Sequence, residues 1–374
     1  MPDLTLIILA AGNSTRFGSK TKKQWIRIDK EPLWLFVANK FKLFHEFKQI
    51  IITGTKQELF YMKKHAPFTF VQGGESRQES IQNALKEVDS EYVLVTDVAR
   101  ACLPKEMVQN IISHKNKADI IVPYIGVSDT VVYENETIDR DKVKLIQTPQ
   151  LSKTSTLRKA LSQKELYTDD SSAIKSIGGS VFYTKGSTNA KKITRYDDLV
   201  SLACLRSSSK DIFVGTGFDV HQFCENKKMF LGGVEIKTDN LGFKAHSDGD
   251  VALHALIDAL LGGIGASDIG ELYPDNDKRF KDIDSKIMLT EVSDFIRSVG
   301  YEINNVDITI MAQAPRVSSY KDAMRSTIAS ILEIEPIFVN IKATTTEKLG
   351  FIGRKEGVAV EAIASLKYNN WMDK

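Results

Sequence analysis

Through the first half of the chain, short runs of β-branched and other apolar residues alternate with longer amphipathic segments. The runs predict strands at residues 4–9, 49–53, 68–71, 92–96 and 119–123. The segments between them predict helices at 32–44, 75–88 and 104–114, with Pro32 and Pro104 as first helical residues. Strands and helices that alternate at this pace are typical of an open, mostly parallel sheet wound on both faces. Such a sheet binds ligands beyond the carboxyl ends of its strands.

The second half departs from strict alternation and predicts an α+β domain. Its expected strands are residues 213–219, 304–312, 337–343 and 357–365, and its expected helices are 250–261, 285–299 and 318–332. Between the halves, a helical run near 197–206 is followed by the serine cluster Ser207–Ser209, which indicates a loop or short linker. We therefore place a boundary at Asp211 and predict domains at 1–211 and 212–374.

Composition narrows the class of protein without naming a function. A chain of 374 residues with 42% apolar and 26% charged residues is an ordinary globular protein of about two domains. The 50 basic and 48 acidic residues give a net charge of +2, so nothing indicates a nucleic-acid or membrane partner. No apolar run reaches membrane-spanning length, and the apolar N-terminus lacks a basic leader. Three cysteines, Cys102, Cys204 and Cys224, are too few and scattered for a disulfide framework, so we expect a cytoplasmic protein.

An Asp-x-His pair suggests a metal site in the second half. On a strand, Asp219 and His221 would point to the same face, and His254 could complete a three-ligand zinc site with an open position. Such pairs are often only structural, and a histidine on an apolar helix is often packed in a core. Cys224 is a competing ligand. Asp258 lies one turn beyond His254 and could orient it as an outer carboxylate.

Two polar runs suggest phosphate chemistry. The hydroxyl triplet Thr344–Thr346 offers donors to phosphate oxygens, and Glu347 offers a hard oxygen ligand for Mg²⁺. In the first half, the small-residue loop 10–18 follows the first strand, where its backbone N–H groups could approach phosphates and Arg16 and Lys23 could neutralise them. That loop lacks the Walker and dinucleotide fingerprints, and taken alone it could be a plain turn.

Further motifs follow the loop in order: 73–80, 96–100, 128–130, Arg140, 147–150, 168–170 and 191–194. The series resembles 2-C-methyl-D-erythritol 4-phosphate cytidylyltransferase over residues 1–211, which implies a Rossmann-like nucleotidyltransferase fold and Mg²⁺ on the triphosphate of CTP. The resemblance implies that Arg16 and Lys23 stabilise the transition state. It also implies substrate contacts by Gly12, Gly73, Arg77, Ser80, Asp97, Arg100, Arg140, Thr148 and Lys192. The chain departs from the usual pattern at Trp25, Glu75 and Val98.

The runs 218–221, 245–254 and 342–351 resemble 2-C-methyl-D-erythritol 2,4-cyclodiphosphate synthase, over residues 212–366. The resemblance implies Zn²⁺ on Asp219, His221 and His254, Mg²⁺ at Glu347, and transition-state roles for His246 and Thr345. It also implies substrate contacts by Ser247, Asp268, Gly270, Tyr273, Asp275, Asp277, Ala312, Ala314, Arg316, Thr344, Thr346, Glu347, Phe351 and Arg354.

Both resemblances together indicate a fused enzyme for two non-consecutive steps of isoprenoid precursor synthesis, with a kinase acting between them. Its substrates would be CTP, methylerythritol phosphate and the cytidylated 2-phosphate. One alternative is a non-catalytic scaffold that recruits the kinase; another is a different sugar-nucleotide transferase fused to a zinc hydrolase. The resemblances further imply trimers of the second domain and pairing of the first through residues 130–147, which combine most simply into a D3 hexamer.

Overall fold

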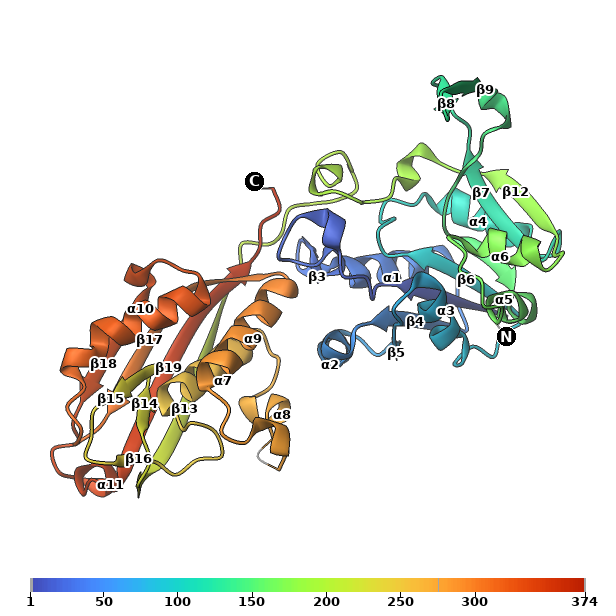
Figure 1. Cartoon of the computed structure of the whole chain (residues 1–374). Coiled ribbons are helices and arrows are strands. Elements are labelled where there is room, and N and C mark those ends of the chain that lie inside the picture. Colours follow the sequence, from blue (N-terminus) through green and yellow to red (C-terminus); the bar gives the residue numbers. More distant parts are fainter. Residues whose placement is uncertain (1–2, 275, 373–374) are drawn as a thin grey trace. The chain divides into compact units, whose positions relative to one another are not determined.

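The computed structural model describes residues 3–274 and 276–372. The chain forms two compact units (Figure 1). The first comprises the residues up to Ser208 together with Trp371 and Met372, and the second comprises Ser209–Asn370. Trp371 and Met372 are therefore part of the first unit, although the predicted second domain included them.

The first unit is built on a mostly parallel sheet with the strand order β10-β7-β11-β6-β1-β4-β5, and β12 pairs with β7. The strands are β1 (Leu4–Leu9), β4 (Gln49–Gly54), β5 (Thr69–Gln72), β6 (Tyr92–Asp97), β7 (Ile120–Ile125), β10 (Leu145–Ile146), β11 (Gln150–Lys153) and β12 (Val181–Lys185). Only β10 and β11 run antiparallel to their neighbours in this sheet. The predicted doubly wound α/β fold is confirmed.

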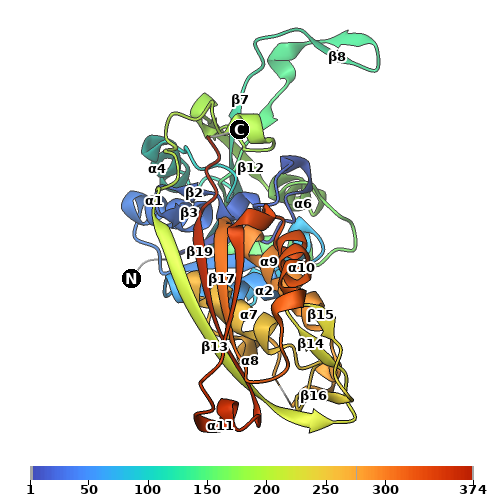
Figure 2. The same cartoon turned by 90° about the vertical axis from the view of Figure 1, so that its left-hand side faces the viewer.

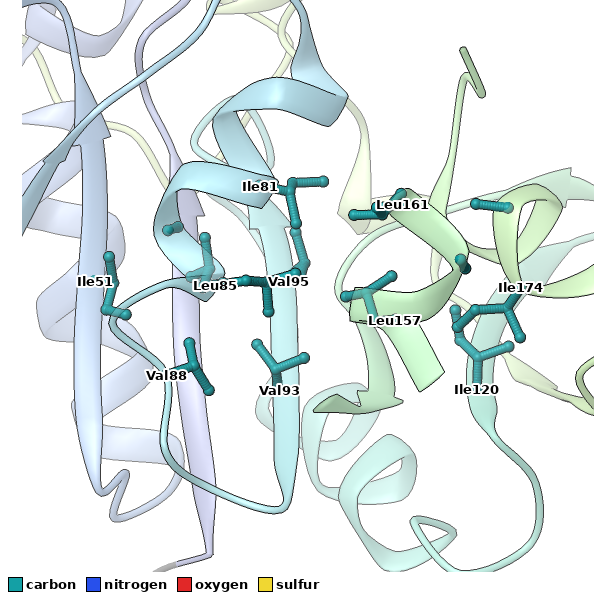
Figure 3. Close-up of a cluster of buried hydrophobic side chains, with 14 of the residues drawn as sticks. Ile51, Ile81, Leu85, Val88, Val93, Val95, Ile120, Leu157, Leu161 and Ile174 are labelled. Atoms are coloured by element: carbon teal, nitrogen blue, oxygen red, sulfur yellow. The ribbon is translucent and has the colours of Figure 1, made fainter. Parts of the chain in front are cut away.

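Helices pack on this sheet through apolar side chains. They are α1 (Leu33–Phe44), α2 (Lys56–His65), α3 (Arg77–Leu85), α4 (Lys105–Ser113), α5 (Thr154–Leu161) and α6 (Asp170–Ser176). Figure 3 shows one face, where Ile81 and Leu85 of α3, Leu157 of α5 and Ile174 of α6 meet strand residues such as Val95. Burial of this cluster holds the strands in register, so the loops after β1, β4, β5 and β6 keep a fixed spacing.

Several local expectations for the first unit were wrong. Pro32 and Pro104 are N-cap residues, one position before the helices begin. The run near 197–206 contains only a 3-10 turn at Tyr196–Asp198 followed by turns. Its leucines, Leu199, Leu202 and Leu205, are buried at a spacing of three, and that spacing imitated a helix. The sequence analysis did not predict α2, although Thr55 and Glu58 have the spacing of a capping box. It also did not predict the hairpin of β8 (Val131–Tyr133) and β9 (Glu136–Ile138).

A disulfide joins Cys102 to Cys204, although the cysteines are too few and scattered for the sequence to predict a disulfide framework. The two residues are 102 positions apart, so their spacing carried no sign of the pairing. Cys102 lies in the loop between β6 and α4, and Cys204 follows the segment that carries Lys192. The bond therefore fastens together two segments that carry predicted site residues. Cys224 is a free thiol.

The second unit has a five-stranded sheet in the order β16-β13-β19-β17-β18. Its strands are β13 (Ile212–Glu225), β16 (Leu241–Phe243), β17 (Tyr301–Met311), β18 (Val339–Thr344) and β19 (Gly357–Tyr368), and β14 (Met229–Leu231) pairs with β15 (Val234–Ile236). Only β17 and β18 are parallel within the large sheet. The helices are α7 (Val251–Gly263), α8 (Ile269–Leu272), α9 (Ser285–Ser298), α10 (Lys321–Leu332) and α11 (Gly350–Gly353).

Helices α7, α9 and α10 lie on one face of this sheet (Figure 2). Gly215 and Gly217 of β13 allow α7 to approach, because a Cβ at Gly215 would stand 2.0 Å from the carbonyl oxygen of Ala259. On the opposite face, alternate side chains are exposed and mostly apolar: Ile212, Val214, Phe218, Val220 and Ile363. Across the described residues, no helix of either unit combines the length and hydropathy that crossing a bilayer requires.

Candidate active sites

A pocket of about 600 Å³ lies in the first unit, where the loops after β1, β4, β5 and β6 converge. This is the edge at which a parallel sheet binds its ligands. The predicted site residues that line it are Gly12, Arg16, Lys23, Gly73, Arg77, Ser80, Asp97 and Lys192. Arg100, Arg140 and Thr148 lie outside this lining, as the described residues define it.

Lys23 sits at the wall of the pocket with its ammonium group largely withdrawn from water. Its Nζ donates a 2.8 Å hydrogen bond to the carbonyl of Ile193. Burial, helped by the nearby charge of Lys192, lowers the pKa of Lys23 to about 8. A cation held in this way is already oriented before a triphosphate arrives, which is what stabilisation of developing charge requires.

Gly73 and Ser80 shape the opposite wall. A Cβ at Gly73 would stand 2.3 Å from the Cβ of Ala11, so the close approach of the two loops requires glycine. The Oγ of Ser80 accepts a 3.0 Å hydrogen bond from the backbone N–H of Gly74 and donates to the carbonyl of Ser76 at 2.9 Å. Ser80 therefore fixes the turn that follows β5.

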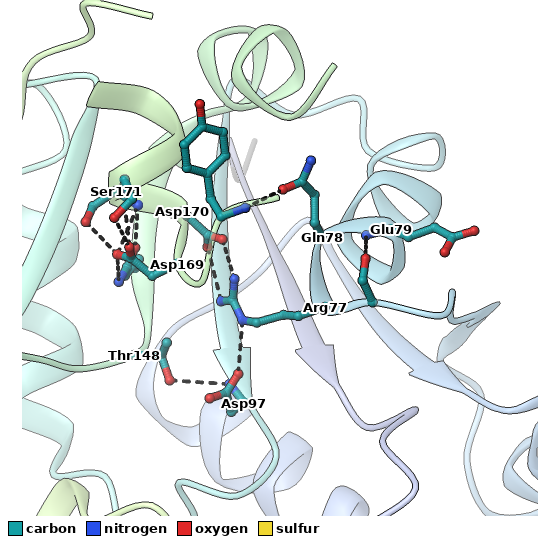
Figure 4. Close-up of polar contacts among 12 residues, drawn as sticks. Arg77, Gln78, Glu79, Asp97, Thr148, Asp169, Asp170 and Ser171 are labelled. Atoms are coloured by element: carbon teal, nitrogen blue, oxygen red, sulfur yellow. Dashed lines mark hydrogen bonds and ion pairs between the residues drawn. The ribbon is translucent and has the colours of Figure 1, made fainter. Parts of the chain in front are cut away.

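Asp97 ends β6 and forms ion pairs with two cations, of which Figure 4 shows Arg77. Lys192 Nζ lies 2.7 Å from one carboxylate oxygen, and Arg77 Nε lies 3.5 Å from the other. Burial alone would raise the pKa of Asp97, but Arg77 and Lys192 hold it below its usual range. Arg77 also pairs with Asp170 at 2.6 Å. Asp170 is a site residue that sequence reasoning quoted in a motif without giving it a role.

The three predicted residues outside the pocket lining have other partners. Arg100 donates to the carbonyl of Ala190, and the Oγ1 of Thr148 accepts from the backbone N–H of Asp97 at 3.4 Å. Arg140 is exposed and donates to the carbonyl of Ser128 at 2.6 Å. It follows the β8–β9 hairpin, which Figure 1 shows projecting from the rest of the first unit.

In the second unit, Asp219, His221 and His254 come together as the sequence predicted. Their potential ligand atoms all lie within 4.8 Å of one another. The Oδ2 of Asp219 is 3.6 Å from the Nδ1 of His221 and 3.3 Å from that of His254. One carboxylate oxygen and two imidazole nitrogens form a donor set that suits a metal such as zinc. The residues present therefore fit the implied metal.

The other ring nitrogen of His254 is held by Ser285. The Oγ of Ser285 lies 2.9 Å from the Nε2 of His254 and donates its own proton to the carboxylate of Asp248. Ser285 must then accept from an Nε2–H group, which leaves the lone pair of Nδ1 facing Asp219. Sequence reasoning missed both Ser285 and the role of Asp248. The expectation that Asp258 orients His254 was wrong, because Asp219 and Ser285 face the two ring nitrogens of that histidine. Asp258 instead accepts from the backbone N–H of Ile269 at 2.8 Å.

The predicted cytidine and magnesium residues form a second group at the β17–β18 side of the sheet. The backbone N–H of Ala312 donates to the carbonyl of Thr344 at 3.0 Å, and Thr345 Oγ1 donates to Glu347 at 2.8 Å. Across the sheet, Thr344 pairs with Met311, which pairs with Ala359, which pairs with Val220 next to the metal triad. Three strand spacings separate the two groups by roughly 14 Å.

The remaining predicted residues have varied surroundings. The Nε2 of His246 is buried and has no hydrogen-bond partner among the described residues.

Asp268 caps α8 by accepting from Glu271, and the hydroxyl of Tyr273 donates to Glu291 at 2.7 Å. Arg354 pairs with Glu356 and Asp277 with Arg279. Ser247 Oγ lies 3.2 Å from His254 Nε2. Asp275 lies outside the described residues. The residues that lie on loops or at short helices are Gly270, Ala314, Arg316, Thr346 and Phe351.

Comparison with family models agrees with this division. A model described as 2-C-methyl-D-erythritol 4-phosphate cytidylyltransferase matches residues 4–206. A second model, described as the YgbB family, matches residues 212–367. Each match spans one of the two candidate sites.

Full-length relatives carry both parts. A protein of Aliarcobacter butzleri named bifunctional enzyme IspD/IspF is 57% identical over 99% of this chain and 99% of its own length. A Campylobacter fetus protein of the same name is 55% identical over the same shares. The solved structure of the bifunctional IspDF from Campylobacter jejuni has a TM-score of 0.87 and 48% identity, and the similarity covers 99% of this chain and all of that one.

Proposed function

The chain belongs to the family of bifunctional IspD/IspF enzymes, and from that premise we propose how its residues carry the two reactions. The first activity transfers CMP from CTP to 2-C-methyl-D-erythritol 4-phosphate and releases diphosphate. The second cyclises 4-diphosphocytidyl-2-C-methyl-D-erythritol 2-phosphate and releases CMP. Nothing in the relatives supports a non-catalytic scaffold.

For the transfer reaction, the pocket of the first unit binds CTP at the small-residue loop 10–18. Arg16 and the protonated Lys23 face the α-phosphorus and stabilise the charge that develops there. Asp97 orients Lys192, which together with Arg100, Arg140 and Thr148 holds methylerythritol phosphate. The observation that supports this proposal is the convergence of eight predicted residues on one pocket.

For the cyclisation, Asp219, His221 and His254 hold zinc, and Glu347 holds magnesium. Zinc bound there supplies Lewis-acid chemistry at a phosphate oxygen. His246 keeps a buried nitrogen available as a donor. The hydroxyl of Thr345 would supply another by turning from Glu347 to the substrate. The remaining predicted residues of the second unit surround the methylerythritol and cytidine parts of the substrate.

We further propose that neighbouring copies complete the second site. Two observations support a trimer: the predicted residues form two groups roughly 14 Å apart, and the open sheet face carries the exposed side chains of Val214 and Phe218. The β8–β9 hairpin, with Val132 and Tyr133 exposed, suits pairing of the first units. Both contacts in one chain give a D3 hexamer. The domain boundary at Asp211, the cytoplasmic location and any association with the intervening kinase stay predictions.

Two half-reaction assays with the purified full chain test the proposal. CTP with methylerythritol phosphate should release diphosphate, and the cytidylated 2-phosphate should release CMP. Chelator treatment followed by zinc alone or magnesium alone distinguishes the metal roles in the second assay. If the second assay proceeds at full rate in metal-free enzyme and buffer, the proposed metal site is wrong. Light scattering should give a hexamer, and a monomer with full cyclising activity contradicts the shared site.

A further inference from the structure

Glu58, a residue outside the pocket lining, contacts the segment that follows the small-residue loop 10–18 of the first unit. It is the third residue of α2 and only 1% exposed. Its Oε2 accepts from the backbone N–H of Thr55 at 3.1 Å and from the Thr55 hydroxyl at 2.5 Å. The bond from the Thr55 backbone is one half of a capping box, whose other half joins the backbone N–H of Glu58 to the Thr55 side chain. A capping box is an ordinary structural role for a glutamate at this position.

The second carboxylate oxygen has partners that a capping box does not need. The Oε1 of Glu58 accepts from the side-chain amide of Gln24 at 2.9 Å and from the indole N–H of Trp25 at 2.7 Å. The ammonium group of Lys22 lies 3.5 Å away. Gln24 and Trp25 are buried and follow Lys23 directly in the chain. The carboxylate therefore fixes the position of the two residues that follow Lys23.

Gln24 extends the same hydrogen-bond network into the small-residue loop 10–18. Its Nε2 also donates to the carbonyl of Gly12 at 3.2 Å, and its Oε1 accepts from the hydroxyl of Ser14 at 3.3 Å. The Oγ of Ser14 in turn accepts from the backbone N–H of Lys23 at 3.1 Å. Because Glu58 is an acceptor only, it fixes which end of the Gln24 amide points toward Ser14.

The loop needs such support because its backbone is not in a relaxed conformation. Ser14 has a φ of 55°, in the left-handed region that non-glycine residues rarely adopt. It precedes the 3-10 turn Thr15–Phe17, which carries Arg16. A connected set of buried and half-buried hydrogen bonds thus runs from Glu58 to the segments of both proposed transition-state cations.

We propose that Glu58 is a positioning residue for cytidylyl transfer, acting through Gln24 to hold Lys23 and the loop of Arg16 in the reactive arrangement. The proposal rests on the roles given above to Arg16 and Lys23. Trp25 belongs to the same device, because its buried indole N–H needs an acceptor and Glu58 provides one. This accounts for a tryptophan at a position where the family resemblance leads one to expect a smaller aromatic residue.

The test compares Glu58→Gln with Asp119→Asn in the full-length enzyme. Glu58→Gln keeps the size of the side chain but places an amide N–H against existing donors. Asp119 is a matched control: it accepts hydrogen bonds from Ser180 and Lys153 in the same unit and has no link to the pocket. We expect Glu58→Gln to lower kcat of the transfer about tenfold or more with little change in KM for CTP. Asp119→Asn should lower Tm without lowering kcat.

The pH profile gives a readout that loss of stability alone would not move. If Lys23 shifts toward water, the alkaline limb of kcat/KM, expected near pH 8, should move to higher pH in Glu58→Gln. Should that variant fail to fold, Glu58→Asp keeps a capping carboxylate but cannot span Thr55, Gln24 and Trp25, and the same loss of kcat is expected. Unchanged kcat and an unmoved limb in a folded Glu58 variant overturn the proposal. Full activity in Lys23→Ala would instead overturn the proposed function itself.

Discussion

The predicted residues of the first site meet in one pocket, whereas those of the second site form two separate groups. In the first unit, loops from four neighbouring strands bring charged residues into one pocket, where Asp97 already pairs with Arg77 and Lys192. In the second unit, the metal triad is gathered at β13 and α7, while the Thr344–Glu347 run lies three strand spacings away. Sheet topology explains the contrast, since parallel strands end at one edge and so collect their loops there.

The two sites therefore depend on different contacts. A pocket made within one unit depends on the internal order of that unit, including the Cys102–Cys204 bond that ties two of its segments together. A site whose residues form two groups on a sheet depends also on whatever contacts join those groups, such as a neighbouring copy of the chain.

His221→Ala should remove the second activity and leave the first. The variant takes away one of three gathered ligands, so metal affinity and cyclisation should both fall below detection, while cytidylyl transfer stays within about twofold. Elemental analysis of the purified protein measures the metal, and the two half-reaction assays measure the activities. Cys224→Ala is the matched control, because that thiol was the competing ligand. Full zinc occupancy in His221→Ala would mean that the ligands are wrongly assigned.

Trp371→Ala should destabilise the first unit although it lies at the end of the second domain's sequence. The side chain is 2% exposed, and its indole N–H donates to the carbonyl of Arg27 at 2.8 Å. Loss of a buried tryptophan should cost about 3 kcal/mol or more in the free energy of unfolding. All three tryptophans of the chain, Trp25, Trp34 and Trp371, belong to the first unit, so tryptophan fluorescence during urea unfolding reports that unit.

Trp371→Phe separates packing from hydrogen bonding at the same position. It keeps most of the buried ring and should cost only about 1 kcal/mol. By the same reasoning, a fragment that ends near residue 210 should be less stable than the first unit within the full chain. Equal unfolding midpoints for the two proteins would contradict this account of the C-terminal end.

Lys23→Ala should lower kcat of the transfer about a hundredfold, as loss of one preorganised charge typically does, with cyclisation unchanged. Because burial sets the pKa of Lys23 at about 8, its proton is present below that pH and is lost as pH rises through it. The kcat/KM of the wild type should therefore fall above pH 8. Lys23→Arg keeps its charge over the whole range, so this alkaline limb should vanish. A change confined to KM for CTP would reduce Lys23 to a binding residue.

Sequence patterns predicted much of the fold because its central elements are strongly periodic. The expected strand at residues 4–9 coincides with β1, and the expected helix at 285–299 differs from α9 by one residue. Short or irregular elements such as α8, α11 and the β8–β9 hairpin gave no periodic signal. The buried leucines at 199–205 gave a false one, because loop residues can also meet a core at intervals of three.

Motifs located site residues more easily than they located the groups that hold them. Asp219, His221 and His254 were identified from spacing, and the structure gathers them. Asp170, Glu58 and Ser285 were not assigned roles, because each acts across a sequence distance that no local pattern records: 93 residues from Asp170 to Arg77, 34 from Glu58 to Gln24 and 31 from Ser285 to His254. Such partners become visible only when packing has brought the elements together.

Ser285→Ala gives the smallest and most specific effect, because it leaves all three metal ligands in place. Without the hydroxyl, the Nε2–H of His254 loses its acceptor at 2.9 Å and keeps only Ser247 at 3.2 Å, so the ring is held less firmly with Nδ1 toward Asp219. Zinc affinity, measured by competition with a chromophoric chelator, should fall about tenfold to a hundredfold, as is typical when an outer partner of a ligating histidine is removed. Ser285→Thr retains a hydroxyl and should recover most of that affinity. Cyclisation at saturating zinc should then exceed that of His221→Ala by a wide margin, since a weakened site can be refilled and a site lacking a ligand cannot. Unchanged zinc affinity in Ser285→Ala would mean that packing alone orients His254. The metal triad would then be prearranged by β13 and α7 only, and Ser285 of α9 would have no part in it.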